Sequence, residues 1–282
     1  MPCFSAEVGP LSKANFVLDY DGVILNSLFE KFVVGFNAHL RIAGTTPLLG
    51  GSELHFDDYR GRLEAEPEIF EAFRAYVPLI GDVGENSVVF RLIERGLQVQ
   101  DRESFRTTIA DFGDDYLQAC SAEVLELRRR YSEIDANTEL CPAFPSVVHD
   151  IKQLANDVLF TICTTKPLQN VEHFNEVLGI GRFIGDIHVC EDNRQKVDIL
   201  DRLAQDFSVE NNEVGFIDDF ARHLLPAHES GFKCFYAAWG FGGPEDEEAV
   251  ERAGIPALGL DGFAPAIREF IAKQGTERKV SG

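Results

Sequence analysis

The sequence predicts an α/β fold, a Rossmann-like doubly wound parallel sheet with an inserted all-helical domain. From residue 144 onward, short apolar runs alternate with helical patterns, which is typical of a parallel sheet with helices on both faces. One further apolar run, residues 15–18, lies far upstream of this part. In the chain between the two, apolar residues recur at helical spacing. We therefore expect a discontinuous α/β core, residues 1–26 and 144–282, and a helical cap domain, residues 27–143.

The first strand is expected at residues 15–18, with the sequence NFVL. Apolar residues then recur at intervals of three and four from Phe29 to Leu40, which predicts a helix. Glycine and proline residues break the remainder of the insert into segments. Further helices are expected at 67–76, 85–96 and 104–130, and no strand is expected between residues 28 and 131.

The second part of the core is expected to contain the remaining strands and their connecting helices. The predicted strands are 157–163, 187–190, 213–217, 232–238 and a short one in PALGL, residues 256–260. The predicted helices are 146–155, 168–178, 195–207, one ending near residue 231, and a last one ending near residue 273. The chain crosses between the parts after Asp21 and in CPAFP, residues 141–145, and paired crossings suit a hinge.

Polar residues follow several of these strands. They are Asp19 and Asp21 after the first strand, Thr164, Thr165 and Lys166 after the second, Asp218 and Asp219 after EVGFI, and Lys196 ahead of a helix. In open parallel sheets ligands bind at the carboxyl ends of the strands. Acids from separate strands can hold Mg²⁺, hydroxyl and ammonium groups can bind phosphate oxygens, and a remaining carboxylate can act as a nucleophile.

Four segments in order resemble the motifs of the haloacid dehalogenase superfamily of phosphatases. They are DYDGVILNS (19–27), FTICTTKP (160–167), the lysine of RQKVDIL (Lys196) and GFIDDF (215–220). The helical insert lies where that family places its type-1 cap. TTKP and WGFGGPED (239–246) resemble segments of phosphoglycolate phosphatases in particular.

The resemblance implies a role for each matching residue. Asp19 would attack phosphorus and form an aspartyl-phosphate, and Asp21 would act as general acid and then base, for which its pKa needs to be raised. Mg²⁺ would be held by Asp19, the backbone carbonyl of Asp21 and Asp219, with Asp218 in support. Thr164, Thr165 and Lys196 would bind the phosphoryl group of a small phosphorylated metabolite. The alternative interpretation of Lys196 is a surface lysine. The alternative for Asp218 and Asp219 is a helix cap.

The sequence also departs from the family pattern and leaves alternatives open. His223 stands where the fourth motif usually has another acid. One alternative is a phosphomutase, which would keep all four motifs. A second is a 2-haloacid dehalogenase, which would lack the acid at Asp21. A third is a non-catalytic binding protein on this fold, for which His223 is the main support. Lys166 is interpreted as a surface or helix-start charge, and WGFGG as an ordinary glycine loop. Residues 55–62 form the most polar loop of the insert, in which Arg60 or Arg62 could contact an anionic substrate tail; the alternative is a solvated loop.

Composition limits the classes of partner. The formal net charge of −21 argues against nucleic-acid binding, and the basic run 128–130 is interpreted as a solvated helix face. The six cysteines show no zinc spacing, and no apolar run is long enough for a membrane span. Without a recognisable signal peptide, the chain is expected to be cytoplasmic with reduced thiols. The sequence does not indicate an oligomeric state.

Overall fold

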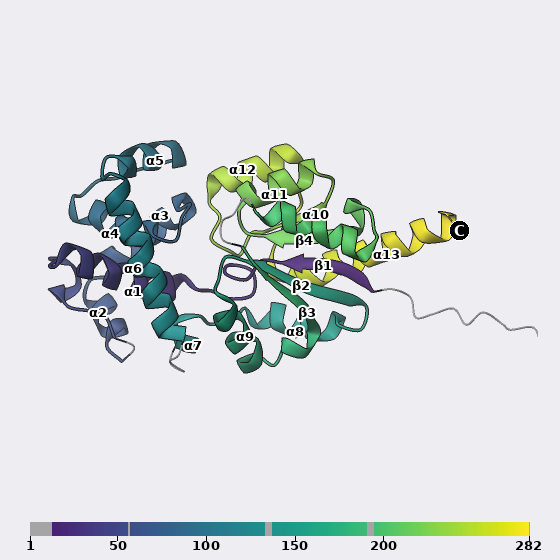
Figure 1. The fold of residues 1–282 in the computed structure, drawn as a ribbon, viewed down its shortest axis with the longest axis horizontal. Coiled ribbons are helices and arrows are strands. Elements are labelled where there is room, and N and C mark those ends of the chain that lie inside the picture. Colours follow the sequence, from purple (N-terminus) through teal and green to yellow (C-terminus); the bar gives the residue numbers. More distant parts are fainter. Residues whose placement is uncertain (1–12, 56, 133–136, 191–194, 282) are drawn as a thin grey trace, which may run out of the picture.

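The computed structural model describes residues 13–55, 57–132, 137–190 and 195–281. Residues 1–12 of the predicted core, including Cys3, lie outside the described residues, as do Phe56 in the predicted polar loop and Arg194 before Lys196. The chain forms an α/β part and a helical block, which we define as residues 28–140, and the two lie side by side (Figure 1).

The sheet has six parallel strands in the order β3-β2-β1-β4-β5-β6, which confirms the predicted fold class. The strands are β1 (Ala14–Leu18), β2 (Val158–Thr164), β3 (Ile184–Val189), β4 (Val214–Asp218), β5 (Lys233–Ala237) and β6 (Ala257–Leu258). The strand order changes direction between β1 and β4, which pair directly. A crevice outside the carboxyl ends of these two strands is the expected ligand site.

Helices cover both faces of the sheet (Figure 1). One face packs on α8 (Pro145–Leu154), α9 (Leu168–Val177) and α13 (Phe263–Ser281), and the other on α10 (Gln195–Phe207), α11 (Ala221–Glu229) and α12 (Pro244–Ala253). Phe16 and Val17, adjacent in β1, belong to the two different core clusters, as alternation along a strand requires. Short 3₁₀ turns occur at Leu48–Gly51, Val77–Leu79, Gly181–Phe183, Asn211–Glu213 and Leu260–Gly262.

The helical block has its own aromatic centre. Its helices are α1 (Leu28–Ala43), α2 (Tyr59–Ala65), α3 (Pro67–Tyr76), α4 (Glu85–Glu94), α5 (Arg102–Ala110), α6 (Asp114–Ser132) and α7 (Asn137–Leu140). The rings of Phe32, Phe73 and Phe90 lie with each pair of centroids 5.2 Å apart, and so join α1, α3 and α4. As expected, no strand forms in the described residues of this block.

Several predicted elements differ from the structure. The strand expected at 187–190 begins three residues earlier, as β3 (Ile184–Val189). The single helix expected at 104–130 is wrong: Gly113 has φ +83° and separates α5 from α6, because a left-handed residue interrupts the helical backbone. The polar loop around residues 55–62 becomes helical at Tyr59, in α2. The last helix continues to Ser281 rather than ending near residue 273.

The two chain crossings lie against each other. Leu25 and Ala143 form an antiparallel bridge, the Asn26 amide donates to the Pro142 carbonyl (2.8 Å), and the Phe144 amide donates to the Ile24 carbonyl (2.9 Å). Entry and exit therefore form one hydrogen-bonded pair of segments, and the division into two domains stays a prediction. None of the helices in the described part of the chain combines the length and apolar character needed to cross a membrane.

Candidate active site

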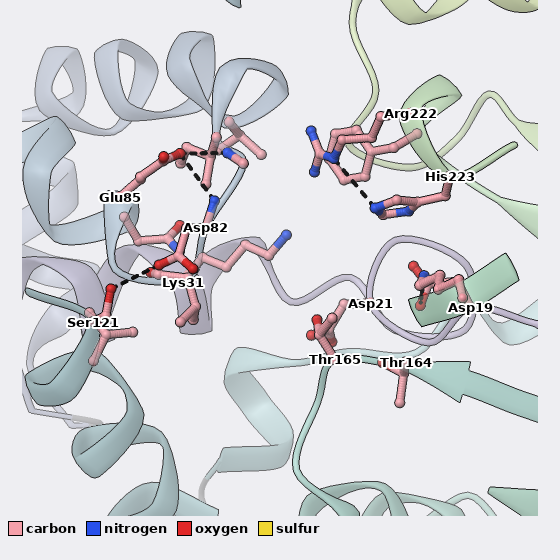
Figure 2. A pocket seen from close by; sticks show the side chains of 18 of the residues that line it. Asp19, Asp21, Lys31, Asp82, Glu85, Ser121, Thr164, Thr165, Arg222 and His223 are labelled. Atoms are coloured by element: carbon pink, nitrogen blue, oxygen red, sulfur yellow. Dashed lines mark hydrogen bonds and ion pairs between the residues drawn. The ribbon is translucent and has the colours of Figure 1, made fainter. Parts of the chain in front are cut away.

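A cleft of about 940 Å³ is lined by residues of both the sheet's carboxyl edge and the helical block (Figure 2). The core contributes five of the predicted site residues to its lining: Asp19, Asp21, Thr164, Thr165 and Lys196. The helical block contributes residues of α1, α4 and α6, among them Lys31, Glu85 and Arg128. The predicted residues Asp218 and Asp219 lie behind this surface, fully buried.

The end of β1 positions two carboxylates in the cleft. The Asp19 amide donates to the Ile217 carbonyl of β4 (3.0 Å), so the residue still follows the edge of the sheet. Asp19 and Asp21 line the cleft, whereas the Tyr20 hydroxyl donates to Asn175 Oδ1 (2.9 Å), as alternation along the strand predicts. Gly22 then turns the chain with φ +93°, a conformation that suits glycine.

Lys196 joins Asp19 to Asp218. Its ammonium lies 3.0 Å from Asp19 Oδ1 and 2.7 Å from Asp218 Oδ2. Burial raises the pKa of Asp19 to about 7, although Lys196 opposes that rise. The ligand atoms of Asp19, Asp218 and His223 lie within 4.8 Å of one another, but the Lys196 ammonium already bridges the two acids of this group.

His223 is a neutral partner of Asp218. Burial lowers the pKa of His223 to about 4. Its Nε2 accepts from Arg222 Nε (3.4 Å), which leaves Nδ1–H to donate to Asp218 at 2.8 Å. Burial would raise the pKa of Asp218, but His223 and Lys196 hold it well below its usual range. His223, which departs from the family pattern, therefore orients the Asp218 carboxylate and stabilises its ionised form.

Asp219 is the carboxylate best suited to a cation. Its Oδ2 accepts the Phe241 amide (2.7 Å), while its buried Oδ1 has no hydrogen-bond partner among the described residues. Burial, with the charges of Asp218 and Asp19, raises the pKa of Asp219 well above its usual range. A buried carboxylate oxygen without a partner, close to a second acid, is chemistry that fits Mg²⁺.

The WGFGG loop supports Asp219, which corrects its interpretation as an ordinary glycine loop. A Cβ at Gly240 would lie 2.3 Å from the Asp219 Cβ, and one at Gly22 would lie 1.9 Å from Asp219 Oδ2. The Trp239 indole donates to the Val23 carbonyl (3.2 Å) and ties this loop to the segment after β1. The two glycines leave the room that the Asp219 side chain occupies.

Asp21 belongs to a buried network of four charges. The Lys166 ammonium lies 3.2 Å from Asp21 and 2.7 Å from Glu30, and the Arg128 guanidinium lies 2.9 Å from Asp21 and 3.2 Å from Glu30. The surface interpretations of Lys166 and Arg128 are therefore wrong: their side chains are 0% and 7% exposed. Tertiary packing brings both cations to carboxylates distant in sequence.

This network sets the charge of Asp21. Burial favours the neutral acid, but Lys166, Arg128 and Lys31 together hold the pKa of Asp21 well below its usual range. The resemblance implied a raised pKa, and in this arrangement the pKa is lowered instead, because two cations lie within hydrogen-bond distance.

The remaining predicted residues have mixed placements. Thr164 is buried at the end of β2, where its Oγ1 accepts the Lys166 amide (3.1 Å), and Thr165 is exposed in the cleft lining. Arg60 is largely exposed near Glu139, and Arg62 donates to backbone carbonyls of its own loop. Neither arginine lines the cleft, so neither is placed to contact an anionic substrate tail there.

Sequence reasoning missed four cleft or network residues: Lys31, Glu30, Arg128 and Arg222. Arg128 follows buried Val124 and Leu127 at helical spacing on α6, and this spacing was a signal that it lies on the inner face. No comparable pattern marks Lys31 or Arg222, because their positions depend on how the helical block lies over the core.

An α/β sheet of this order, with acids and cations gathered at its carboxyl edge under a helical block, defines a class of capped Rossmann-like proteins. The sequence model of the haloacid dehalogenase-like hydrolase family matches residues 93–237, slightly more than half of the chain. The chain belongs to this family. The matched residues include Thr164, Lys196, Asp218 and Asp219, whereas Asp19 and Asp21 precede them. No curated protein matches the chain.

Solved structures share the fold at low sequence identity. A predicted phosphoglycolate phosphatase from Haemophilus somnus matches with TM-score 0.59 and 12% identity, covering 92% of this chain and 100% of that one. A haloacid dehalogenase-like hydrolase from Streptococcus pneumoniae matches with TM-score 0.55 and 16% identity, over 88% and 93%. A predicted phosphatase from Clostridium acetobutylicum matches with TM-score 0.53 and 14% identity, over 92% and 100%.

Proposed function

We propose that this protein is a Mg²⁺-dependent phosphatase of small phosphate monoesters that works through an aspartyl-phosphate on Asp19. The observation that carries the proposal is the pair formed by Asp19 and Lys196, 3.0 Å apart in the lining of the cleft. A carboxylate nucleophile beside a buried ammonium can meet a phosphoryl group whose oxygens the ammonium stabilises. Membership of a hydrolase family supports the reaction class.

The chain's own residues would act in sequence. A carboxylate oxygen of Asp19 forms the bond to phosphorus as the bond to the ester oxygen breaks, and Lys196, Thr164 and Thr165 orient the phosphoryl oxygens. Asp21 donates a proton to the departing alkoxide and then takes one from the water that hydrolyses the acyl phosphate. Because Lys166 and Arg128 favour ionised Asp21, the arrangement suits the base step better than the acid step.

A divalent cation fits the acids behind the cleft. Asp19 and Asp219 would hold it, with the backbone carbonyl of Asp21 and the carboxylate of Asp218 in support, and the unpartnered Asp219 Oδ1 is the structural basis for this assignment. Bound there, Mg²⁺ would reduce the repulsion between a carboxylate and an anionic phosphate ester.

Phosphoglycolate is the first substrate to test, since TTKP and the WGFGG loop resemble segments of phosphoglycolate phosphatases and two structural neighbours carry that name. Hydrolysis of a chromogenic phosphate monoester, with and without Mg²⁺, tests the reaction class. We expect Mg²⁺-dependent release of phosphate by the wild type and none by Asp19→Asn. Full turnover by Asp19→Asn would refute the mechanism.

Two alternatives have distinct outcomes in the same assay. A phosphomutase would return an isomeric phosphate ester without net phosphate release, whereas a non-catalytic binding protein would leave every ester unchanged. The described acids and cations argue for catalysis, because all of Asp19, Asp21, Thr164 and Lys196 line one cleft. The cytoplasmic location expected from the sequence stays a prediction.

A further inference from the structure

We propose that Lys31 and Arg222 form a second anion-binding subsite in the cleft, so that the substrate is a small phosphate monoester carrying another anionic group. This inference rests on the proposed phosphatase function and narrows its substrate class. Both residues line the same cleft as Asp19 and Lys196, one from α1 of the helical block and one from α11 of the core.

Arg222 is a cation whose hydrogen-bonding capacity is incompletely used. Its Nη1 is buried and has no hydrogen-bond partner in the described parts of the chain, while its Nε donates to His223 (3.4 Å). The guanidinium carbon lies 3.8 Å from the centroid of the Phe220 ring, which fixes the plane of the group. No described carboxylate lies within ion-pair distance of it. A planar guanidinium held in this way presents free N–H donors to an anion.

Lys31 is the second unpaired cation. No described carboxylate pairs with its ammonium, which lies 3.9 Å above the Phe241 ring. Burial lowers the pKa of Lys31, the charges of Asp21 and Asp219 raise it, and the charges of Arg128 and Arg222 lower it, so Lys31 interacts electrostatically with acids and cations of the same cleft. An anion between two cations that have no ion-pair partner would stabilise both charges.

Other cations of the cleft do not share this property. Lys196 contacts Asp19 and Asp218, and Arg128 contacts Asp21 and Glu30. Arg106 is exposed, so water satisfies its charge. Lys31 also helps to lower the pKa of Asp21, but neither Lys31 nor Arg222 lies within ion-pair distance of a described carboxylate, so both cations can still contact a ligand.

The two groups point away from the residues assigned to the phosphoryl group. Figure 2 shows the Lys31 amine and the Arg222 guanidinium directed into the space between the helical block and the core, while Thr164 lies farther from both cations, beyond Asp21. A phosphoryl group at Asp19 would leave this space for the remainder of the ester. A carboxylate or a second phosphate is the chemistry that two cations would bind there.

Glu85 offers the main alternative partner for Arg222. Its Oε2 accepts the amides of Gly81 and Asp82 at the start of α4 (2.5 and 3.1 Å), and it is not within ion-pair distance of Arg222. A movement of the helical block that joined Glu85 to Arg222 would give the arginine a structural role. Glu85→Gln separates the two cases, because it removes this potential ion pair and leaves the cations in place.

The decisive experiment compares phosphoglycolate with 2-hydroxyethyl phosphate, which has the same phosphate ester and a neutral tail. We measure kcat/KM on both substrates for the wild type, Arg222→Gln, Lys31→Met and the charge-conserving Arg222→Lys. We expect the ratio favouring phosphoglycolate to fall roughly tenfold to a hundredfold in each neutral variant, as for a lost charge-assisted hydrogen bond. Arg222→Lys should recover part of the ratio.

Controls separate the subsite from general effects. Arg74→Gln removes an arginine that is 64% exposed on α3, outside the cleft lining, and should leave the ratio unchanged. An equal loss on both substrates would overturn the inference and place the cations at the phosphoryl group instead. A ratio lost in Glu85→Gln as fully as in Arg222→Gln would also overturn it, in favour of the ion-pair role.

A binding readout keeps the inference testable if no ester is hydrolysed. In an Asp19→Asn background, phosphoglycolate and glycerol 1,3-bisphosphate should each raise Tm more than 2-hydroxyethyl phosphate does, and Arg222→Gln should remove the difference. The two anionic ligands distinguish a carboxylate site from a phosphate site. If wild-type turnover is absent but this difference is present, the phosphatase proposal fails while the subsite stands; equal Tm shifts for all three ligands would refute the subsite.

Discussion

The guanidinium of Arg128 on α6 lies 2.9 Å from the carboxylate of Asp21 just beyond β1 and joins the helical block to the carboxyl edge of the sheet. With Lys166 and Glu30 it forms a network of two cations and two anions, all buried or nearly so. The network links α1 and α6 of the block to the loops after β1 and β2. Its integrity is therefore expected to affect both stability and the position of the block.

Replacement of Arg128 by methionine should lower the free energy of unfolding by about 3 kcal/mol or more, since loss of one member leaves buried carboxylates undercompensated. Urea unfolding of the metal-free protein measures this. Arg129→Met is the matched control on the same helix: its side chain is 56% exposed and pairs with Glu126 at the surface, so a change below about 0.5 kcal/mol is expected. Equal effects of the two substitutions would contradict the structure.

Neutralising the adjacent residues Asp218 and Asp219 should have opposite effects on the metal-free protein. Asp219 has a buried oxygen with no partner in the described chain, so Asp219→Asn should raise Tm without Mg²⁺ and abolish the rise in Tm that Mg²⁺ produces. Asp218 is paired with Lys196 and His223, so Asp218→Asn should lower Tm. Differential scanning calorimetry with and without Mg²⁺ provides both values. A fall in Tm for Asp219→Asn would show that its carboxylate is already satisfied.

Alanine at Gly22 should cost more stability than alanine at Gly44, although both glycines have positive φ, +93° and +75°. Nothing lies within 4 Å of a Cβ at Gly44, so only the backbone cost of about 1 kcal/mol is expected there. A Cβ at Gly22 would lie 1.9 Å from Asp219 Oδ2, so Gly22→Ala must also displace that acid. We expect this variant to lose Mg²⁺ affinity as well, measured by titration calorimetry. Similar unfolding energies and unchanged Mg²⁺ affinity would argue against the close approach.

His223 should make the protein sensitive to mild acid. Its pKa falls to about 4 in the folded chain, from an ordinary value near 6.5, because burial disfavours its charged form. The unfolded chain therefore binds more protons between these values, so the contribution of neutral His223 is complete above about pH 6.5 and declines as pH falls toward 4. The slope has an upper limit of about 1.4 kcal/mol per pH unit.

His223→Asn tests this dependence, because an asparagine amide can still donate to Asp218 but does not titrate. Unfolding free energies at pH 7.5 and pH 5 should differ less in the variant than in the wild type. The comparison cancels the opposite contribution of Asp19, whose raised pKa favours the folded state at lower pH in both proteins. A parallel pH dependence of the two proteins would exclude His223 as the titrating group.

The sequence by itself predicted the sheet, the insert and the residues beyond the strands. Alternating patterns identified β1 and β2 within a residue at each end, and α10 at its exact bounds of Gln195–Phe207, because buried strands and amphipathic helices have local periodicity. Asp19, Asp21, Thr164 and Asp218 could be singled out because the carboxyl ends of parallel strands must share one edge.

The tertiary structure decided how those residues are charged and partnered. The sequence reads Lys166 and Arg128 as surface cations, and only packing of the helical block on the core buries them beside Asp21 and lowers its pKa. The pairing of His223 with Asp218 likewise depends on the distance between separate elements. The same holds for Lys31, which has no paired acid in the described structure. Periodicity in the sequence indicates which face of an element is buried. The pKa values and the energies of buried charges depend instead on the distances between charged groups of separate elements. Local sequence patterns do not encode those distances.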